Sequence, residues 1–109
     1  MEKTIDEIDF EKGNGLVPVI VQDINTKEIL TLAYTNKESL ELTRKTGNSR
    51  FWSRSRNKIL MKGEESGNVQ KVNEILVDCD SDAIIYMVEP SGPACHTGKK
   101  VCFHNFLKK

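Results

Sequence analysis

Six short runs of β-branched and other apolar residues, separated by short polar turns, most constrain the fold of this 109-residue chain. Residues 15–21 and 28–34 flank the polar loop 25–27 and predict a hairpin. The other strand-like runs are residues 49–54, 58–62, 69–78 and 83–88. Strands joined by short turns pair with their neighbours in the sequence, so we expect an antiparallel meander. Apolar positions in the run 69–78 do not alternate perfectly, which indicates a bulge or a register change.

One helix is expected between the second and third strands. Thr35 and Glu38 have the spacing of a capping box, Leu40 and Thr43 share one helical face, and Gly47 is a typical helix stop. The expected fold class is therefore α+β, a mostly antiparallel β-sheet with one short helix.

The length of the chain predicts one domain, residues 1–109, because single cores commonly occupy about 100–150 residues. A chain this short buries a small share of its surface, which favours a homodimer. Sixteen basic and sixteen acidic residues cancel, and this balance argues against nucleic acid as a partner. The N-terminal residues carry acids instead of an apolar signal, and no run approaches the ~20 apolar residues of a membrane span. We therefore expect a cytoplasmic protein with no membrane partner.

The three cysteines are Cys79, Cys95 and Cys102, and Cys95 falls in residues 90–100, whose prolines and glycines predict a loop. Their odd number and their spacing fit neither a disulfide framework nor a four-ligand zinc finger. Three thiolates on zinc leave a fourth position for water, as in catalytic zinc sites. Free cysteines are also commonly small buried apolar residues. The spacing alone does not decide between these interpretations.

Three aspartates surround the first cysteine: Asp78, Asp80 and Asp82. If the strand continues through Asp80, then Asp78 and Asp80 share one face and the thiol between them points to the other. Repulsion among three close carboxylates favours a bound magnesium or calcium ion over a solvated acidic turn. With Glu89 these residues also match an EF-hand calcium loop, but Ala83 stands where that loop needs glycine, so we reject the EF-hand.

Aromatic and basic residues interleave in residues 51–56, and a Lys-Gly-Glu-Glu-Ser-Gly segment follows in residues 62–67. A tryptophan can stack on a base, basic side chains can neutralise phosphates, and a Ser-Gly turn can offer backbone donors. The same pattern is typical of a half-buried hairpin with solvated arginines, and that interpretation stays open. The candidate nucleotide-binding residues are Trp52, Arg54, Ser55, Arg56, Lys62, Ser66 and Gly67.

Five motifs, in residues 15–23, 51–56, 62–70, 78–82 and 94–103, follow one another in a specific order. Taken together they resemble phosphoribosyl-AMP cyclohydrolase, the enzyme of the third step of histidine biosynthesis. The resemblance covers residues 15–103, and five motifs in register are far more specific than any one of them.

The resemblance implies hydrolysis of the N1–C6 bond in the adenine ring of N1-(5-phosphoribosyl)-AMP, which opens the purine to a formimino imidazole carboxamide ribonucleotide. It implies a zinc ion held by Cys79, Cys95 and Cys102, and a magnesium ion held by Asp78, Asp80 and Asp82. It also implies an obligate homodimer in which Cys79 comes from one subunit and the other two thiols from its mate. The expected partners are thus a small nucleotide substrate and a second copy of the chain.

The chemistry of zinc suggests roles for two further residues. A zinc-activated water would attack C6 as in zinc deaminases, with N1 as the leaving group instead of an amine. His96, beside a zinc ligand, is the first candidate for proton transfer, and Glu64 is the second. Many members of the family carry a second, pyrophosphate-hydrolysing domain, and we expect this chain to be monofunctional. The alternatives are another zinc-dependent nucleotide hydrolase or deaminase, and a non-catalytic metal-binding module.

Overall fold

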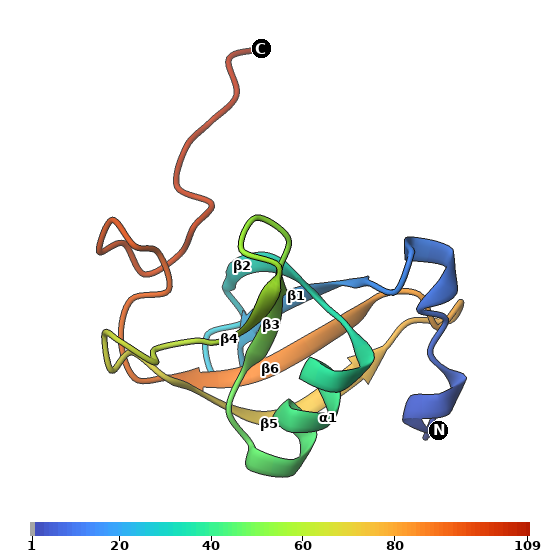
Figure 1. Ribbon diagram of the computed structural model, residues 1–109. Helices are drawn as coiled ribbons and strands as arrows, with labels where there is room; N and C mark the ends of the chain where they lie inside the picture. The colour runs from blue at the N-terminus through green and yellow to red at the C-terminus, as the bar shows by residue number, and fades with distance from the viewer. Residues whose placement is uncertain (1) are drawn as a thin grey trace.

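A four-stranded mixed sheet forms the centre of the computed structural model, which describes residues 2–109; Met1, where the expected domain begins, lies outside them. Its order is β2 (Ile29–Thr35), β1 (Val17–Asp23), β6 (Ile84–Pro90) and β5 (Gln70–Val77). β1 pairs antiparallel with β2 and β5 with β6, whereas β1 and β6 run parallel. Figure 1 shows β6 crossing the middle of the molecule. The register shift expected in the run 69–78 is confirmed, between Val72 and Glu74 of β5.

The predicted meander is wrong in two respects. β3 (Arg50–Ser53) and β4 (Lys58–Met61) form a separate two-stranded sheet, and β6 lies between β1 and β5. The last strand, β6, is too apolar to lie at an edge, where a meander would leave it. It takes a central position beside β1, which satisfies its backbone on both sides and covers both of its faces. The buried residues of these two strands are Val17, Val19, Val21, Asp23, Ile84, Tyr86, Met87 and Val88.

The single α-helix, α1 (Lys37–Thr46), begins one residue later than predicted. Asn36, not Thr35, is its N-cap: the Asn36 side chain accepts a hydrogen bond from the Ser39 backbone N–H at 2.8 Å. The Ser39 hydroxyl accepts in return from the Asn36 backbone N–H at 2.9 Å. The Thr35–Glu38 capping box is therefore wrong, because β2 extends through Thr35 and leaves the cap to the stronger N-cap residue asparagine.

The buried face and the end of α1 agree with the sequence. Leu40 and Thr43 are buried, and Gly47 closes the helix in the left-handed conformation at φ 78°. The Thr43 hydroxyl lies 3.3 Å from the hydroxyl of Tyr86 in β6, whose ring packs against Phe51 of β3 with centroids 5.6 Å apart. These contacts join the helix and the β3–β4 hairpin to the central sheet.

Two short 3₁₀ helices that the sequence did not indicate, Ile5–Glu7 and Glu11–Gly13, bring the N-terminal segment against the turn between β5 and β6. The Asp9 backbone N–H donates to the Ser81 carbonyl at 2.7 Å. At the other end, residues 91–109 contain neither helix nor strand, and Figure 1 shows the last of them extending away from the body. Within residues 2–109 no helix is long and apolar enough to cross a bilayer.

Candidate active site

A groove of about 580 Å³ lies along the β3–β4 hairpin. It receives side chains from β3, from β4, from the turn that follows β4 and from the loop after β6. The candidate residues that it brings together are Trp52, Arg56, Lys62, Glu64, Ser66 and His96. Leu60 and Met61 of β4 supply part of its apolar lining. Side chains that the sequence analysis selected for nucleotide binding and for proton transfer thus share one open cavity.

A second hollow, of about 540 Å³, adjoins the groove at Trp52 and is lined by Arg54, Ser55 and Tyr34 of β2. The Arg54 guanidinium lies 3.9 Å from the centroid of the Tyr34 ring, a cation–π contact that orients the arginine. Gly67 lines neither hollow; its backbone N–H donates to the Gly63 carbonyl at 2.9 Å and closes the turn after β4.

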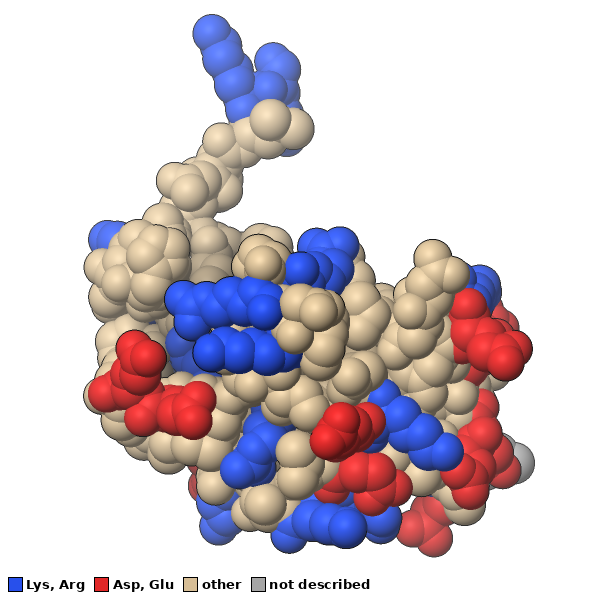
Figure 2. All heavy atoms as spheres, viewed as in Figure 1, with Lys and Arg blue, Asp and Glu red and all other residues tan. Residues whose placement is uncertain are grey.

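Lys58 and Tyr34 are among the residues of these hollows that the sequence analysis did not select. Lys58 lines the groove and pairs with Ser53 across the hairpin. The hairpin register was a signal that would have placed Lys58 near the basic residues of β3 and its turn. Tyr34 had no such signal, because only the packing of β2 on β3 brings it to Arg54. In Figure 2 basic side chains gather over the β3–β4 hairpin, which makes this face suited to an anionic ligand.

The loop after β6 brings Cys95 and Cys102 together. Hydrogen bonds within the loop join the Ala94 N–H to the Lys100 carbonyl at 3.1 Å and the Cys95 N–H to the Lys99 carbonyl at 3.2 Å. The Cys102 N–H donates to the carbonyl of Leu30 in β2 at 2.7 Å, which attaches the loop to the sheet.

The environment of the Cys95 thiol favours the thiolate. A side-chain hydrogen bond from Thr97, with a hydroxyl-to-sulfur distance of 3.1 Å, is the largest cause that lowers the pKa of Cys95 to about 6. The Thr97 backbone N–H, the His104 ring at 3.8 Å and the Cys102 thiol act in the same direction. A thiolate is the form that binds metal, so this pair of cysteines has the donor chemistry of a soft metal site.

Cys79 lies at the opposite end of β6, in the turn that precedes this strand (Figure 1). The seven residues of β6 span roughly 20 Å, whereas zinc binds thiolates at about 2.3 Å. One chain therefore brings together two of the three candidate thiols and leaves the third apart. Within residues 2–109, no group of three or more histidine, cysteine, aspartate and glutamate side chains is arranged to hold a metal ion.

The acidic turn that contains Cys79 follows β5, which ends at Val77, so the strand alternation considered for Asp78 and Asp80 does not apply. One carboxylate oxygen of Asp78 accepts hydrogen bonds from the backbone N–H groups of Asp82 at 3.0 Å and Ala83 at 3.3 Å. Asp78 thus stabilises the turn itself.

Two lysines of the N-terminal segment supply positive charge to this turn. The Lys12 ammonium lies 2.5 Å from the Asp82 carboxylate, and its hydrogen bond is the first cause that lowers the pKa of Asp82, followed by a hydrogen bond with Asp78. The Lys3 ammonium donates to the carbonyls of Asp78 and Cys79. The repulsion among the aspartates is therefore already reduced by lysine.

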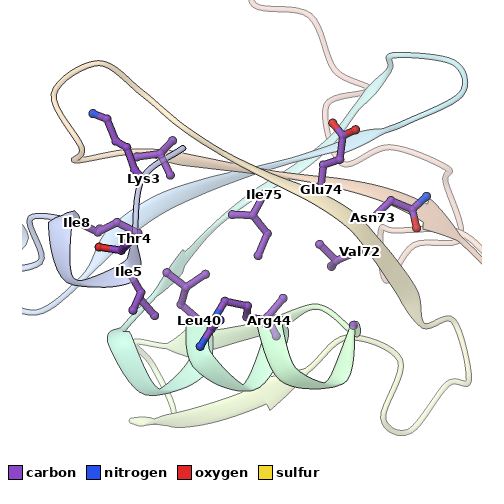
Figure 3. Close-up of a pocket in the computed structure, with 13 residues that line it drawn as sticks. Lys3, Thr4, Ile5, Ile8, Leu40, Arg44, Val72, Asn73, Glu74 and Ile75 are labelled. Atoms are coloured by element: carbon purple, nitrogen blue, oxygen red, sulfur yellow. The ribbon is translucent and has the colours of Figure 1, made fainter. Parts of the chain in front are cut away.

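An apolar pocket of about 320 Å³ lies between α1, β5 and the N-terminal segment (Figure 3). Ile5, Leu40 and Ile75 face one another across it, and all three belong to the hydrophobic core or pack against it. It contains none of the residues chosen from the sequence for substrate binding, proton transfer or metal binding. We interpret it as an incompletely filled layer of the core and not as the substrate site.

Comparison with known proteins agrees with the resemblance seen in the motifs. Residues 31–104 match the family model of phosphoribosyl-AMP cyclohydrolase. A phosphoribosyl-AMP cyclohydrolase of Nitrosopumilus maritimus is 78% identical over 99% of this chain and 100% of its own length. One of Cenarchaeum symbiosum is 75% identical over 98% of this chain and 99% of its own length. A histidine biosynthesis bifunctional protein of Pyrococcus furiosus is 54% identical over 98% of this chain and 51% of its own length. The chain belongs to the phosphoribosyl-AMP cyclohydrolase family.

Proposed function

We propose that this chain is a histidine-biosynthesis hydrolase that opens the adenine ring of N1-(5-phosphoribosyl)-AMP at the N1–C6 bond with zinc-activated water. The observation that carries the proposal is the groove along the β3–β4 hairpin, which combines an aromatic ring, basic side chains and two proton-transfer candidates. Its volume of about 580 Å³ is in the range of small-molecule sites.

The residues of the groove divide into two functions. Trp52 offers its ring for stacking on the purine, and Arg56 and Lys62 offer positive charge to a phosphate. Arg54, held on the Tyr34 ring in the adjoining hollow, is suited to the second phosphate of the substrate.

Ring opening requires a proton for the departing N1, and His96 and Glu64 both line the groove. An imidazole exchanges protons near neutral pH, so His96 is the preferred donor to N1. His96 also follows Cys95 directly, so the proton donor and a thiol of the candidate zinc site stand on one loop.

The donor set of the cysteines suits zinc in its chemistry, because the three thiols are free and Cys95 favours the thiolate. Zinc supplies Lewis-acid activation of water in such sites. A single chain provides Cys95 and Cys102 from one loop, so we propose that a second copy of the chain provides Cys79. The proposed enzyme is accordingly a homodimer with two shared sites.

We also propose that Asp78, Asp80 and Asp82 hold magnesium. Their carboxylate oxygens are the donors that magnesium prefers, and the backbone N–H of Asp82 already donates to the Asp78 carboxylate, which holds these two residues close together. The Lys12 side chain that pairs with Asp82 is 62% exposed. Exposed ion pairs are weak, so a divalent cation can replace this lysine.

The deciding experiment is turnover of phosphoribosyl-AMP by purified protein supplied with zinc and magnesium. We expect the ring-opened nucleotide as the product, identified by mass spectrometry as substrate plus one water. Release of ammonia would instead identify a deaminase, and metal-loaded protein without turnover would overturn the proposal.

A further inference from the structure

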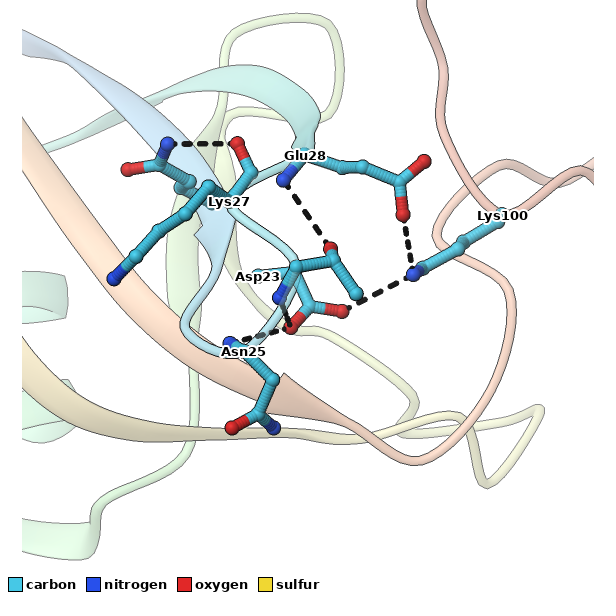
Figure 4. A network of polar contacts seen from close by, with 7 residues as sticks. Asp23, Asn25, Lys27, Glu28 and Lys100 are labelled. Carbon is cyan, nitrogen blue, oxygen red and sulfur yellow. Dashed lines mark hydrogen bonds and ion pairs between the residues drawn. The ribbon is translucent and has the colours of Figure 1, made fainter.

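A buried carboxylate at the end of β1 contacts the loop that bears two of the candidate zinc thiols. Asp23 is 4% exposed, and one of its oxygens accepts from the backbone N–H groups of Asn25 at 2.9 Å and Thr26 at 3.2 Å. Its other oxygen lies 3.3 Å from the ammonium of Lys100. Figure 4 shows Lys100 reaching from the loop after β6 to Asp23 and Glu28, at the two ends of the β1–β2 turn.

Because Asp23 is buried, loss of its ion pair with Lys100 would be costly. Burial acts to raise the pKa of the Asp23 carboxyl, but the two backbone N–H groups and the Lys100 ammonium outweigh it and leave this pKa below its usual value. The N–H groups of Asn25 and Thr26 already hold one Asp23 oxygen within the β1–β2 turn. The Lys100 ammonium is therefore an additional partner, from a residue 77 positions later in the sequence. A charge paired in a buried position is costly to lose, unlike an exposed ion pair.

Lys100 stands between the two thiols, five residues after Cys95 and two before Cys102. Its carbonyl accepts from the Ala94 N–H and its ammonium is fixed to the sheet, so one residue closes the loop and attaches it. The Cys102 N–H on Leu30 supplies a second attachment at the same end of the sheet.

We propose that Asp23 is a positioning residue, which acts through Lys100 to hold Cys95 and Cys102 in the arrangement that binds metal. This inference rests on the proposed zinc site. Residues that orient metal ligands without binding the metal themselves commonly contribute about 10–100-fold to metal affinity. Asp23 and Lys100 touch no part of the substrate groove, so their effect is expected in the metal site and in the order of the loop.

The test compares Asp23→Asn and Lys100→Met with the wild-type chain. An asparagine oxygen still accepts from the Asn25 and Thr26 N–H groups, so Asp23→Asn removes the charge and keeps the turn. We expect both variants to weaken zinc binding about 10–100-fold in a competition titration with a chelating dye. Without metal, we expect faster hydrogen exchange of the amides of Ala94, Cys95 and Cys102. The double variant should match Lys100→Met, because that substitution already removes the ion pairs of Lys100 with both Asp23 and Glu28.

Asp6→Asn is the matched control, since it removes the carboxylate from an exposed pair with Lys37 far from the loop, and it should change neither readout. Unchanged zinc affinity and loop exchange in Lys100→Met, whose side chain is half-exposed and dispensable for the core, would overturn the inference even if Asp23→Asn failed to fold. If the wild-type chain binds no zinc, the proposed function fails in that respect, and the hydrogen exchange still decides the role of Asp23.

Discussion

At the scale of single residues, two kinds of side chain stand out for their chemistry: a thiol with a lowered pKa, and basic groups around an aromatic ring. Cys95 represents the first kind. Its thiol receives a hydrogen bond from Thr97 and lies beside His104 and Cys102, and all of these contacts favour the thiolate. Such an environment is characteristic of metal-binding or reactive cysteines and not of structural ones.

The pKa of Cys95 predicts a pH dependence for its alkylation in the metal-free protein. Because the pKa is lowered to about 6, the thiol is protonated and unreactive below that pH and becomes a reactive thiolate above it. We expect the rate of modification by iodoacetamide to rise through pH 6 and to level off before pH 8. Mass spectrometry of the peptide that contains Cys95 measures this rate.

Thr97→Val serves as the companion variant, since it keeps the shape of the side chain and removes the largest cause of the shift. The rise in reactivity should then move to higher pH. An identical profile in this variant would show that Thr97 does not control the thiol.

Arg56 represents the basic groups of the groove. Replacing Arg56 by alanine removes a cation from the proposed phosphate site, and hydrogen bonds to charged groups contribute about 1.5–3 kcal/mol. We expect KM for phosphoribosyl-AMP to rise roughly 10–100-fold with a smaller change in kcat. Lys45→Ala is the control, because Lys45 is an exposed cation of α1 outside both hollows, and its KM should equal that of the wild type. Equal effects of the two substitutions would indicate only a general dependence on charge.

At the scale of elements, the order of the strands was harder to predict than their positions. Alternating or continuous apolar runs located all six strands to within about two residues. The order of apolar residues within a strand reflects whether one or both of its faces are buried, so the local sequence is sufficient to find it. Pairing depends on competition between strands for the centre of the sheet. The continuous apolar run 83–88 indicates a strand buried on both faces, but it does not indicate that β1 is the neighbouring strand.

In the candidate site, too, contacts between neighbouring segments were predictable from the sequence, and contacts between distant segments were not. The hairpin of β3 and β4 brings Trp52 and Arg56 together because neighbouring strands with a short turn are close by necessity. The ion pair of Asp23 with Lys100 joins segments 77 positions apart. Both residues lie within motifs, 15–23 and 94–103, but nothing in those motifs pairs one with the other. The separation of Cys79 from the other thiols likewise follows from the direction of β6 and not from spacing.

The turn between β4 and β5 carries a prediction of its own, because it shapes one wall of the groove. Gly63 has φ 83°, and a Cβ atom there would lie 2.4 Å from the backbone nitrogen of Val69. The clash involves backbone, so Gly63→Ala must open the turn, and we expect a loss of about 2–4 kcal/mol in the free energy of unfolding. Thermal unfolding measures the loss, and kcat should fall with it because Glu64 moves.

Gly13→Ala is the matched control for this turn, since nothing lies within 4 Å of the added Cβ and its φ is not positive. Its melting temperature should stay close to that of the wild type. A Gly63→Ala variant as stable as Gly13→Ala would mean that the turn can rearrange freely.

At the scale of the whole molecule, the proposed zinc site poses one question: how thiols in the segments beyond the two ends of β6, a strand that spans roughly 20 Å, could hold one ion. The proposed homodimer would answer it, because in a dimer with a two-fold axis each copy could offer its Cys79 to the loop of the other.

Mixed dimers test the shared site directly. Neither Cys79→Ala nor Cys95→Ala homodimers contain a complete set of ligands, but a mixed dimer combines the intact loop of one subunit with the intact Cys79 of the other. With random exchange in an equal mixture, half of the dimers are mixed and each has one of two sites, so we expect roughly one quarter of the wild-type turnover and zinc content. Mixing Cys95→Ala with Cys102→Ala should restore nothing, because both substitutions damage the loop and each loop remains incomplete. Recovery confined to the first mixture requires that the loop thiols come from one copy and Cys79 from the other, whereas no recovery in either mixture would contradict a zinc site shared between subunits.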